Sequence, residues 1–475
     1  MTAPDSSVGA VDTARLRAEV IALAMPAIGH SLLRMAVFVG DRVMLSNYSP
    51  EAIAAMQVSG PMNWTLMACL GIFVVGTVAT VARAHGAGRL EDVRAATTVS
   101  LGLGFGLGLL ATLLLPLIPA IVLLFRSERV SAEALAGAEV YLSTLIASYP
   151  IFLLAVAAAH VMSARGDTRT PFLVGLLTNS LNLILNVFLI FGVGGAPELG
   201  VQGAAIATAV ARVFEGLLLV GLLVAGPRRV FEGLRGVLTA RREALATALA
   251  TILRLSAPSL LERLVYHSGF LAFAALVTRL GTEAMASNQA VLSVESFCFT
   301  TTSSCGVAAA AIVGQRLGAE RPEEARQGAL EALRLALGLM AAAGVIYLAA
   351  ARPIAGIFHD DPGLVDLSAT ILMICVLELP GLAVADVIAQ ALRGAGDTRS
   401  PLLVTMVCAW LIRVLGAWIA TRVFDFGLVG IWLVTALEWS VKGAILWLIF
   451  RRGRWMTVEV LVDEGAAASP GGQAT

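Results

Sequence analysis

The chain has 475 residues, of which 58% are hydrophobic and only 14% are charged, and its formal net charge is zero. Its mean hydropathy is +0.85. A chain with so few polar side chains cannot cover the surface of a water-soluble protein of this length, which excludes the soluble classes. Lipid is therefore the expected solvent.

Apolar segments of 20 or more residues recur along almost the whole chain, and an α-helix needs this length to cross about 30 Å of hydrocarbon. The first segment is too long for a signal peptide and follows a polar N-terminal stretch, so we expect it to be retained. The composition predicts an all-α membrane protein with twelve transmembrane helices. Their expected limits are 20–46, 57–83, 97–125, 139–162, 170–192, 201–226, 251–279, 288–315, 328–358, 365–392, 401–423 and 427–450.

Arginines are divided unevenly between alternate connections of these spans. One set of connections is rich in arginine, as in Arg83, Arg89 and Arg94 after the second span. The opposite connections contain only Arg126, Arg129, Arg279, Arg352 and Arg422. Because cytoplasmic loops carry the excess of basic residues, we expect both termini in the cytoplasm and the chain in the cell inner membrane.

The second half of the chain repeats the first. Pro26 aligns with Pro258 and Gly86 with Gly318 at one offset of 232, and the motif RGDTRTP recurs later as AGDTRSP. Each repeat holds six spans, an even number, so both halves enter the membrane from the same side. We expect two pseudo-symmetric six-helix bundles. The expected parts are an N-lobe (1–226), a cytoplasmic linker (227–250), a C-lobe (251–450) and a cytoplasmic tail (451–475).

Three polar residues of the first half fall at one depth of the membrane, and a fourth lies close by. Asp41, Asn186 and Thr208 lie five to seven residues from the outer ends of their spans by our expected limits, and Asn182 lies one turn deeper. An ionisable group in mid-membrane costs at least about 2.5 kcal/mol, so Asp41 needs a reason to be there. One carboxylate with amide and hydroxyl oxygens suits a proton or Na⁺. The alternative is an Asp that neighbouring amides hold for structural reasons.

The repeat provides an internal control for this cluster. Position 41 corresponds to Phe273, position 182 to Ile412, and position 186 to Gly416 or Arg413, so the second half lacks the polar set. Only Thr208 keeps its type, as Thr435. A purely architectural need would be expected in both halves.

The second half has a different set of ionisable residues within its spans. Glu438 and Lys442 are four residues apart on one helix, so an ion pair is expected. Glu262 and Asp386 have no sequence-near partner on their own face, and two interpretations stay open: a structural role, or binding of a cationic substrate or a proton. The full set is Glu262, Glu295, Glu378, Asp386, Arg413, Glu438 and Lys442. In the first half, Arg34 and Glu215 are expected to be partners of each other.

Several motifs resemble those of the multidrug and toxic compound extrusion family. The first half contains VGDRVMLSNYSPEAIAAMQVSG, ARAHGAGRLEDVRAA and LGVQGAAIATAVAR, and the second contains LGTEAMASNQAVL and VGQRLGAERPEEAR. The resemblance implies a V-shaped pair of six-helix lobes that exchange H⁺ or Na⁺ for organic, often cationic, drugs. It also implies that the family's first-helix Asp, fifth-helix Asn and sixth-helix Thr are Asp41, Asn182 and Thr208.

The chain departs from the family pattern at two positions. Many prokaryotic members have Asp where this chain has Asn186, which leaves Asp41 as the only carboxylate of its cluster. Other branches place a Glu eight residues after the proline of the seventh helix, where this chain has Tyr266. Any coupling or substrate role in the C-lobe would therefore fall to Glu262, Tyr266, Glu295, Asp386 or Arg413.

The expected function is that of a monomeric secondary antiporter that exports small organic compounds across the lipid bilayer. We expect no nucleic acid partner, no metal and no cofactor apart from the coupling ion, H⁺ or Na⁺. A flippase for lipid-linked saccharides is the alternative, and it would favour an arginine-rich cavity. The candidate arginines are Arg34, Arg42, Arg212, Arg263 and Arg413. A membrane-embedded enzyme is not expected, because no catalytic dyad is visible.

Overall fold

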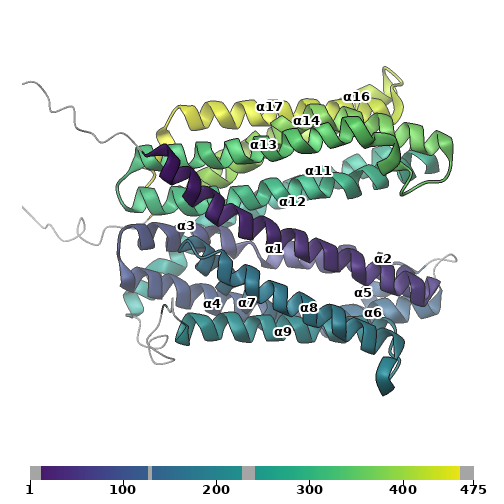
Figure 1. Cartoon of the computed structure of the whole chain (residues 1–475), viewed down its shortest axis with the longest axis horizontal. Coiled ribbons are helices and arrows are strands. Elements are labelled where there is room, and N and C mark those ends of the chain that lie inside the picture. The colour runs from purple at the N-terminus through teal and green to yellow at the C-terminus, as the bar shows by residue number, and fades with distance from the viewer. Residues whose placement is uncertain (1–11, 127–130, 227–229, 231–240, 461–475) are drawn as a thin grey trace, which may run out of the picture.

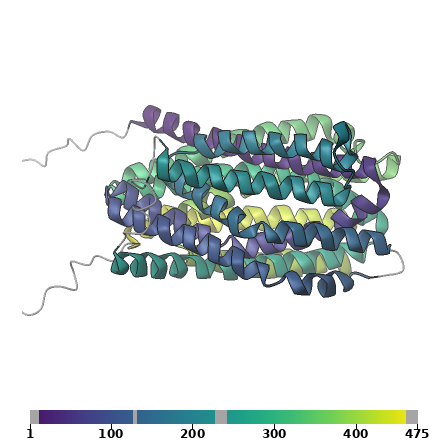
Figure 2. The ribbon, with the colours of Figure 1, turned by 90° about the horizontal axis from the view of Figure 1, so that it is seen from below.

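The computed structural model describes residues 12–126, 131–226, 230 and 241–460. The described part of the chain is helical throughout, apart from turns and short connections. Its helices form two lobes that lie side by side, with α1 to α9 in one and α11 to α17 in the other (Figure 1). Helices of both lobes run along the same long axis (Figure 2). The expected all-α fold with two bundles is confirmed.

The N-lobe begins with a long helix and contains three spans that are interrupted by short breaks. Its elements are α1 (Thr13–Tyr48), α2 (Pro50–Leu70), α3 (Phe73–Gly86), α4 (Leu90–Thr112), η1 (Leu115–Leu117), α5 (Ile118–Leu123), α6 (Ala132–Ala147), α7 (Tyr149–Ala164), α8 (Arg169–Phe191), η2 (Val193–Gly195) and α9 (Val201–Ala225).

The C-lobe contains longer continuous helices and one π-helical segment. Its elements are α11 (Arg242–Thr278), α12 (Thr282–Gly318), α13 (Pro322–Ala355), α14 (Pro362–Gly394), α15 (Arg399–Val407), η3 (Cys408–Val414), α16 (Leu415–Arg422), α17 (Gly427–Arg451) and η4 (Arg454–Thr457). The helix α11 already begins at Arg242, so residues 242–250 of the expected linker are helical. Its first turns are rich in strong helix formers, which extend the helix beyond the apolar window that hydropathy detects. The rest of the expected linker lies outside the described residues, apart from Val230 and Arg241, and so do residues 461–475 of the expected tail.

Among the described residues, eleven helices are long and apolar enough to cross a membrane, or up to twelve if the bent pair α6 and α7 is one span. This pair is bent by 55°. The bend lies at Ser148, next to Pro150 in the first turn of α7, where proline lacks the backbone N–H that would continue the helix. The number of spans agrees with the twelve expected.

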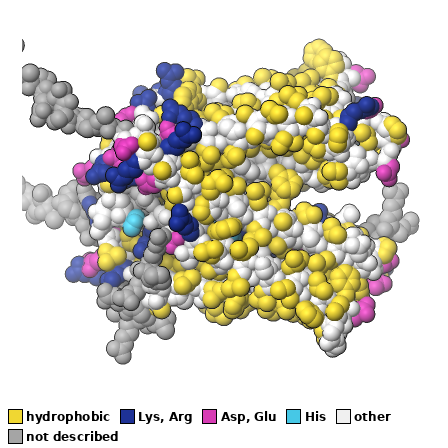
Figure 3. Space-filling view, viewed as in Figure 1, with side chains coloured by type: hydrophobic (Ala, Val, Ile, Leu, Met, Phe, Trp, Pro, Cys, Tyr) yellow, Lys and Arg dark blue, Asp and Glu magenta, His cyan; other side chains and the backbone are white. Residues whose placement is uncertain are grey.

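The surface has the distribution that a bilayer requires. Hydrophobic side chains cover the middle of the molecule, whereas charged side chains gather at its two ends (Figure 3). Large apolar side chains such as Leu113, Leu271 and Val345 are more than half exposed, which lipid tolerates and water does not. The chain is therefore a multi-pass membrane protein.

The two lobes meet at the end of the molecule that carries Asp12 and Val460, which we call the termini end. Here α3 and α12 cross without room for a side chain. A Cβ on Gly86 would lie 1.8 Å from the carbonyl oxygen of Gln315, and one on Gly318 would lie 2.0 Å from that of Arg83. At the opposite end the molecule is hollowed between the lobes (Figure 3). Together these features give the V shape that the resemblance implies.

Candidate functional site

The structure brings the four polar residues of the N-lobe together, and we call this cluster the Asp41 site. Asn186 Nδ2 donates to Asp41 Oδ1 at 2.6 Å and lies 3.3 Å from Asn182 Oδ1. Asn182 Nδ2 in turn donates to Thr208 Oγ1 at 3.2 Å. The site therefore links three helices, α1, α8 and α9. The structure thus joins, by hydrogen bonds, the residues that the sequence placed near one another in depth.

Helix geometry explains why these side chains converge. Asn182 and Asn186 are one turn apart on α8 and so lie on the same face. The helix α9 approaches α8 closely at Gly203, where a Cβ would lie 2.3 Å from the carbonyl oxygen of Leu189. Asn179, one turn before Asn182, takes no part in the site, because its amide donates to the carbonyl of Gly175 on its own helix at 2.6 Å.

The Asp41 site contains a buried hydrogen-bond acceptor that no donor satisfies. Asp41 is 7% exposed, Asn182 is 3% exposed and Asn186 is fully buried. The amide oxygen of Asn186 has no hydrogen-bond partner. A buried carboxylate costs free energy unless it is compensated, and an unused amide oxygen beside it adds to this cost. The cluster can therefore accept a proton or a small hard cation.

Sequence reasoning missed the surroundings of this site. Tyr141 of α6 is buried, lies within hydrogen-bond reach of Thr208 and is near Asp41. Arg212 of α9 is the basic residue whose charge acts on Asp41, and its guanidinium stacks 4.3 Å from the ring centroid of Phe152. Arg212 could have been identified from the sequence, because it is a charged residue inside a predicted span. Nothing in the sequence distinguishes Tyr141.

Two other charged residues of α1 lie apart from the site. The guanidinium of Arg42 stacks 4.3 Å from the ring centroid of Phe38, so it is not the counter-ion of Asp41. Arg34 lies deeper along α1, where its charge acts on Glu215 of α9. Their expected partnership as an ion pair stays a prediction.

The C-lobe residues do not form one site but a series of pairs. Glu262 of α11 accepts from Arg393 Nη2 on both oxygens at 2.8 Å, and Thr405 Oγ1 donates to it at 2.9 Å. Asp386 of α14 accepts from Thr302 Oγ1 at 3.1 Å. The partner of Glu262 comes from a distant helix, which the sequence could not show, and it favours a structural role for this carboxylate.

The expected pair of Glu438 and Lys442 is replaced by another. Glu438 Oε2 lies 2.6 Å from Arg413 Nη2 and accepts from Arg413 Nε at 2.9 Å. Lys442 instead lies 4.8 Å from the ring centroid of Trp439 and 5.8 Å from that of Tyr266. Arg413 belongs to the π-helical segment η3, whose extra residue per turn re-aims the side chain toward α17. Arg413 therefore pairs with the carboxylate of Glu438, which was expected to pair with Lys442.

Glu295 of α12 lies beside Glu378 of α14, for which the sequence pattern predicted no role. Their carboxyl groups are within hydrogen-bond reach of each other. Both are buried, at 3% and 0% exposure. Among the described residues, no group of three or more His, Cys, Asp and Glu side chains could hold a metal ion.

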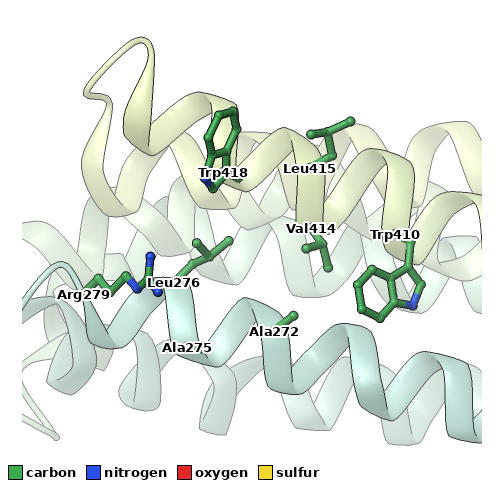
Figure 4. A pocket seen from close by; sticks show the side chains of 8 residues that line it. All are labelled: Ala272, Ala275, Leu276, Arg279, Trp410, Val414, Leu415 and Trp418. Atoms are coloured by element: carbon green, nitrogen blue, oxygen red, sulfur yellow. The ribbon is translucent and has the colours of Figure 1, made fainter.

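The C-lobe counterpart of the Asp41 site is apolar. A groove of about 480 Å³ lies between α11 and the η3 to α16 helix (Figure 4). It is lined on one side by Ala272 and Leu276, neighbours of Phe273, and on the other by Trp410 and Leu415. The two lobes share a fold, but the hydrogen-bonded cluster of Asp, Asn and Thr side chains is found in the first lobe.

Comparisons with known proteins agree with the repeat and the fold. The MatE family model matches residues 26–188 and again residues 258–419. A probable multidrug resistance protein NorM of Thermotoga maritima is 30% identical over 450 residues, which cover 94% of this chain and 95% of that relative. An uncharacterized transporter, YisQ, of Bacillus subtilis is 24% identical over 418 residues, with 88% and 90% covered.

Solved structures show the same architecture. A MOP superfamily transporter from Pyrococcus furiosus matches with a TM-score of 0.84 at 22% identity, covering 94% of this chain and 97% of that chain. A crystal structure of MATE in the straight conformation matches with a TM-score of 0.83 at 24% identity, covering 93% and 97%. The family match in both halves, the relative at 30% identity and the two-lobe fold lead to one conclusion: the chain belongs to the MatE family and is a MATE transporter.

Proposed function

We propose that this transporter exports small organic compounds, often cationic ones, in exchange for H⁺ or Na⁺, and that the coupling ion binds at the Asp41 site. The observation that carries the proposal is the buried Asp41 carboxylate, which accepts a hydrogen bond from the amide of Asn186, while the oxygen of that same amide has no partner. The name of the Thermotoga relative, a probable multidrug resistance protein, supports the choice of substrate class.

Occupancy of the site changes the charge of Asp41 and so the contacts of α1. An empty site holds a carboxylate that relies on Asn186, whereas a bound proton or Na⁺ compensates this charge. Because Asp41 and Asn186 belong to different helices, the two occupancy states favour different positions of α1 against α8. An ion that binds one arrangement better shifts the population toward it, and this is the coupling step.

The proposed direction of transport depends on membrane orientation. The arginine distribution supports a cytoplasmic termini end in the cell inner membrane. The described chain then has its lobes closed toward the cytoplasm, at the crossing of Gly86 and Gly318, and its hollow open to the outside. This is the arrangement in which a substrate would leave and the coupling ion would enter.

The experiment is dye efflux from reconstituted vesicles under an imposed pH or Na⁺ gradient. Asp41→Asn keeps the shape of the side chain but removes its titration and its charge, so gradient-driven export should fall to the level of protein-free vesicles. Asp366→Asn is the matched control, because this carboxylate lies at the surface, paired with Arg352 and 54% exposed. Wild-type efflux from a well-folded Asp41→Asn protein would refute the proposed coupling site.

A further inference from the structure

The apolar groove of the C-lobe runs between α11 and the helix formed by η3 and α16 (Figure 4). The small side chains of Ala272 and Ala275 line it on α11, whereas Trp410 and Trp418 line it on the opposite helix. The two tryptophans are 45% and 47% exposed, so the described chain leaves about half of each uncovered. The volume of about 480 Å³ is within the range of sites that bind small molecules.

The groove has the depth of one leaflet of a bilayer. The helix α11 ends at Thr278 and α16 at Arg422, at the opposite end to the termini end (Figure 1). Trp410 precedes Arg422 by twelve residues, which is about 18 Å of helix at about 1.5 Å per residue. Half of the hydrocarbon core of a bilayer is about 15 Å thick. The groove therefore reaches from the headgroup region to near the middle of the membrane, which is the depth of one acyl chain.

A single charged residue, Arg279, lines this groove. It follows the last residue of α11 and lies with Trp418 at one end of the groove, whereas Trp410 lies at the other (Figure 4). Arginine is scarce in the connections on this side of the chain, and Arg352 among them is held in an ion pair with Asp366. Within the described residues Arg279 has no such carboxylate partner. Its guanidinium can therefore bind a phosphate through two parallel hydrogen bonds.

The repeat indicates that the fold itself does not require these residues. Arg279 corresponds to Asn47 at the offset of 232, and α8, the counterpart of the η3 to α16 helix, contains no tryptophan. In the N-lobe a Cβ on Gly40 would lie 3.8 Å from Leu183 Cδ1, so α1 and α8 are in contact there. Gly40 corresponds to Ala272, which lines the open groove. Aromatic walls and a basic end are thus features of the second half.

The π-helical segment η3 forms part of the groove wall. It extends from Cys408 to Val414 and contains Trp410, and within it Arg413 turns toward Glu438 of α17. Such π-helical turns occur frequently at functional sites. Because Arg413 is held by Glu438, the wall that η3 presents to the groove is apolar, and it suits an acyl chain.

We propose that the groove binds one phospholipid from the leaflet at this end of the membrane, with an acyl chain between α11 and α16 and the phosphate on Arg279. Walls on two sides give the chain more contacts than the convex surface of one helix, and a basic group between helices holds the head group. An acidic lipid such as phosphatidylglycerol should bind best, because the charge that lines the groove is positive. The site is separate from the Asp41 site and does not depend on transport.

Native mass spectrometry of the full chain, purified in detergent and titrated with phosphatidylglycerol, counts the bound lipids. One lipid should stay bound at concentrations where the others dissociate. Arg279→Gln should raise the concentration for half-occupancy about tenfold or more, because it removes the charge-assisted bonds to the phosphate. Ala275→Phe should also weaken binding, because it fills the groove. Arg126→Gln is the matched control, since Arg126 is an exposed arginine of the same set of connections that does not line the groove.

A phosphatidylglycerol with a photoactivatable acyl chain locates the site in vesicles. Its cross-links should concentrate in residues 272–279 and 410–418 and be lost in Ala275→Phe. Even labelling of all lipid-facing helices, or equal retention of the lipid by Arg279→Gln and the control, would overturn the proposal. Displacement of the lipid by an exported dye would make the groove a substrate site instead. A dimer without bound lipid would assign the groove to a second copy of the chain.

Discussion

At the scale of single residues, Asn186 connects the parts of the N-lobe site. Its amide group contacts both Asp41 and Asn182, and its own oxygen is left unpaired. An amide at this position leaves Asp41 as the only carboxylate of the cluster. The identity of residue 186 should therefore set how many charges the site holds and over which pH range it loads.

Replacing Asn186 by Asp should change the pH or Na⁺ dependence of efflux. A second carboxylate within about 3 Å of Asp41 makes a like-charge pair, whose protons are released in two separated steps. The initial efflux rate of Asn186→Asp, measured against pH at constant gradient, should follow a broadened or two-step profile. Asn179→Asp on the same helix is the control, because Asn179 bonds only to Gly175. Identical profiles for Asn186→Asp and the wild type would contradict the prediction.

The ion pair of Glu262 and Arg393 leads to a prediction about stability. Removing one partner leaves a buried charge uncompensated, which costs about 3–5 kcal/mol, whereas replacing both with neutral residues costs much less. Arg393→Gln should therefore lower the melting temperature more than the double variant Glu262→Gln with Arg393→Gln. Equal melting temperatures for the single and double variants would mean that Glu262 is compensated in another way, for example by Lys442.

At the scale of helices, the sequence predicted the number of spans and the repeat, because length and hydropathy determine whether a helix crosses a bilayer. It also placed Asp41, Asn186 and Thr208 at one depth, since each position follows from the distance to a span end. The bend between α6 and α7 was not predicted, although Pro150 marks its place. Hydropathy is insensitive to the direction of a helix.

Most contacts between the helices of a lobe could not be predicted from the sequence. The partner of Glu438 is Arg413 and not Lys442, because a π-helical turn changes the direction of Arg413. The pairing of Glu262 with Arg393, and the contact of Glu295 with Glu378, join residues more than 80 positions apart. Spacing rules act within one helix, so they cannot assign such partners.

The crossing of α3 and α12 can be tested at this scale. In an exposed helix, Gly→Ala stabilises by up to about 1 kcal/mol, but a Cβ on Gly318 would lie 2.0 Å from the carbonyl oxygen of Arg83. Gly318→Ala should therefore lower the melting temperature by several degrees. Gly338→Ala in α13 is the control, because a Cβ there meets nothing within 4 Å. Unchanged stability of Gly318→Ala would mean that the helices do not cross this closely.

At the scale of the whole molecule, the segment after α17 joins the two lobes at the termini end. Val460 is 1% exposed and packs against Ala79 of the N-lobe and Leu255 of the C-lobe. The carbonyl of Val458 accepts from Arg83 Nη2 at 3.1 Å, and that of Val460 from Arg254 Nη2 at 3.4 Å. The segment therefore contacts α3 of one lobe and α11 of the other, and it stabilises the arrangement in which this end is closed.

A charge at Val460 should loosen that closure. Val460→Asp places an unpaired carboxylate in the apolar contact with Ala79 and Leu255, which burial disfavours, so the segment should detach. Spin labels at Glu91 and Glu323, exposed positions that correspond at the offset of 232, report the separation of the lobes at the termini end. Their distance distribution should broaden toward longer values in Val460→Asp. In the control Glu459→Gln it should stay as in the wild type, because the side chain of Glu459 is exposed. If Val460→Asp leaves the distance distribution unchanged, the crossing at Gly86 and Gly318 is sufficient to keep the lobes together. The C-terminal segment then does not stabilise the closed arrangement.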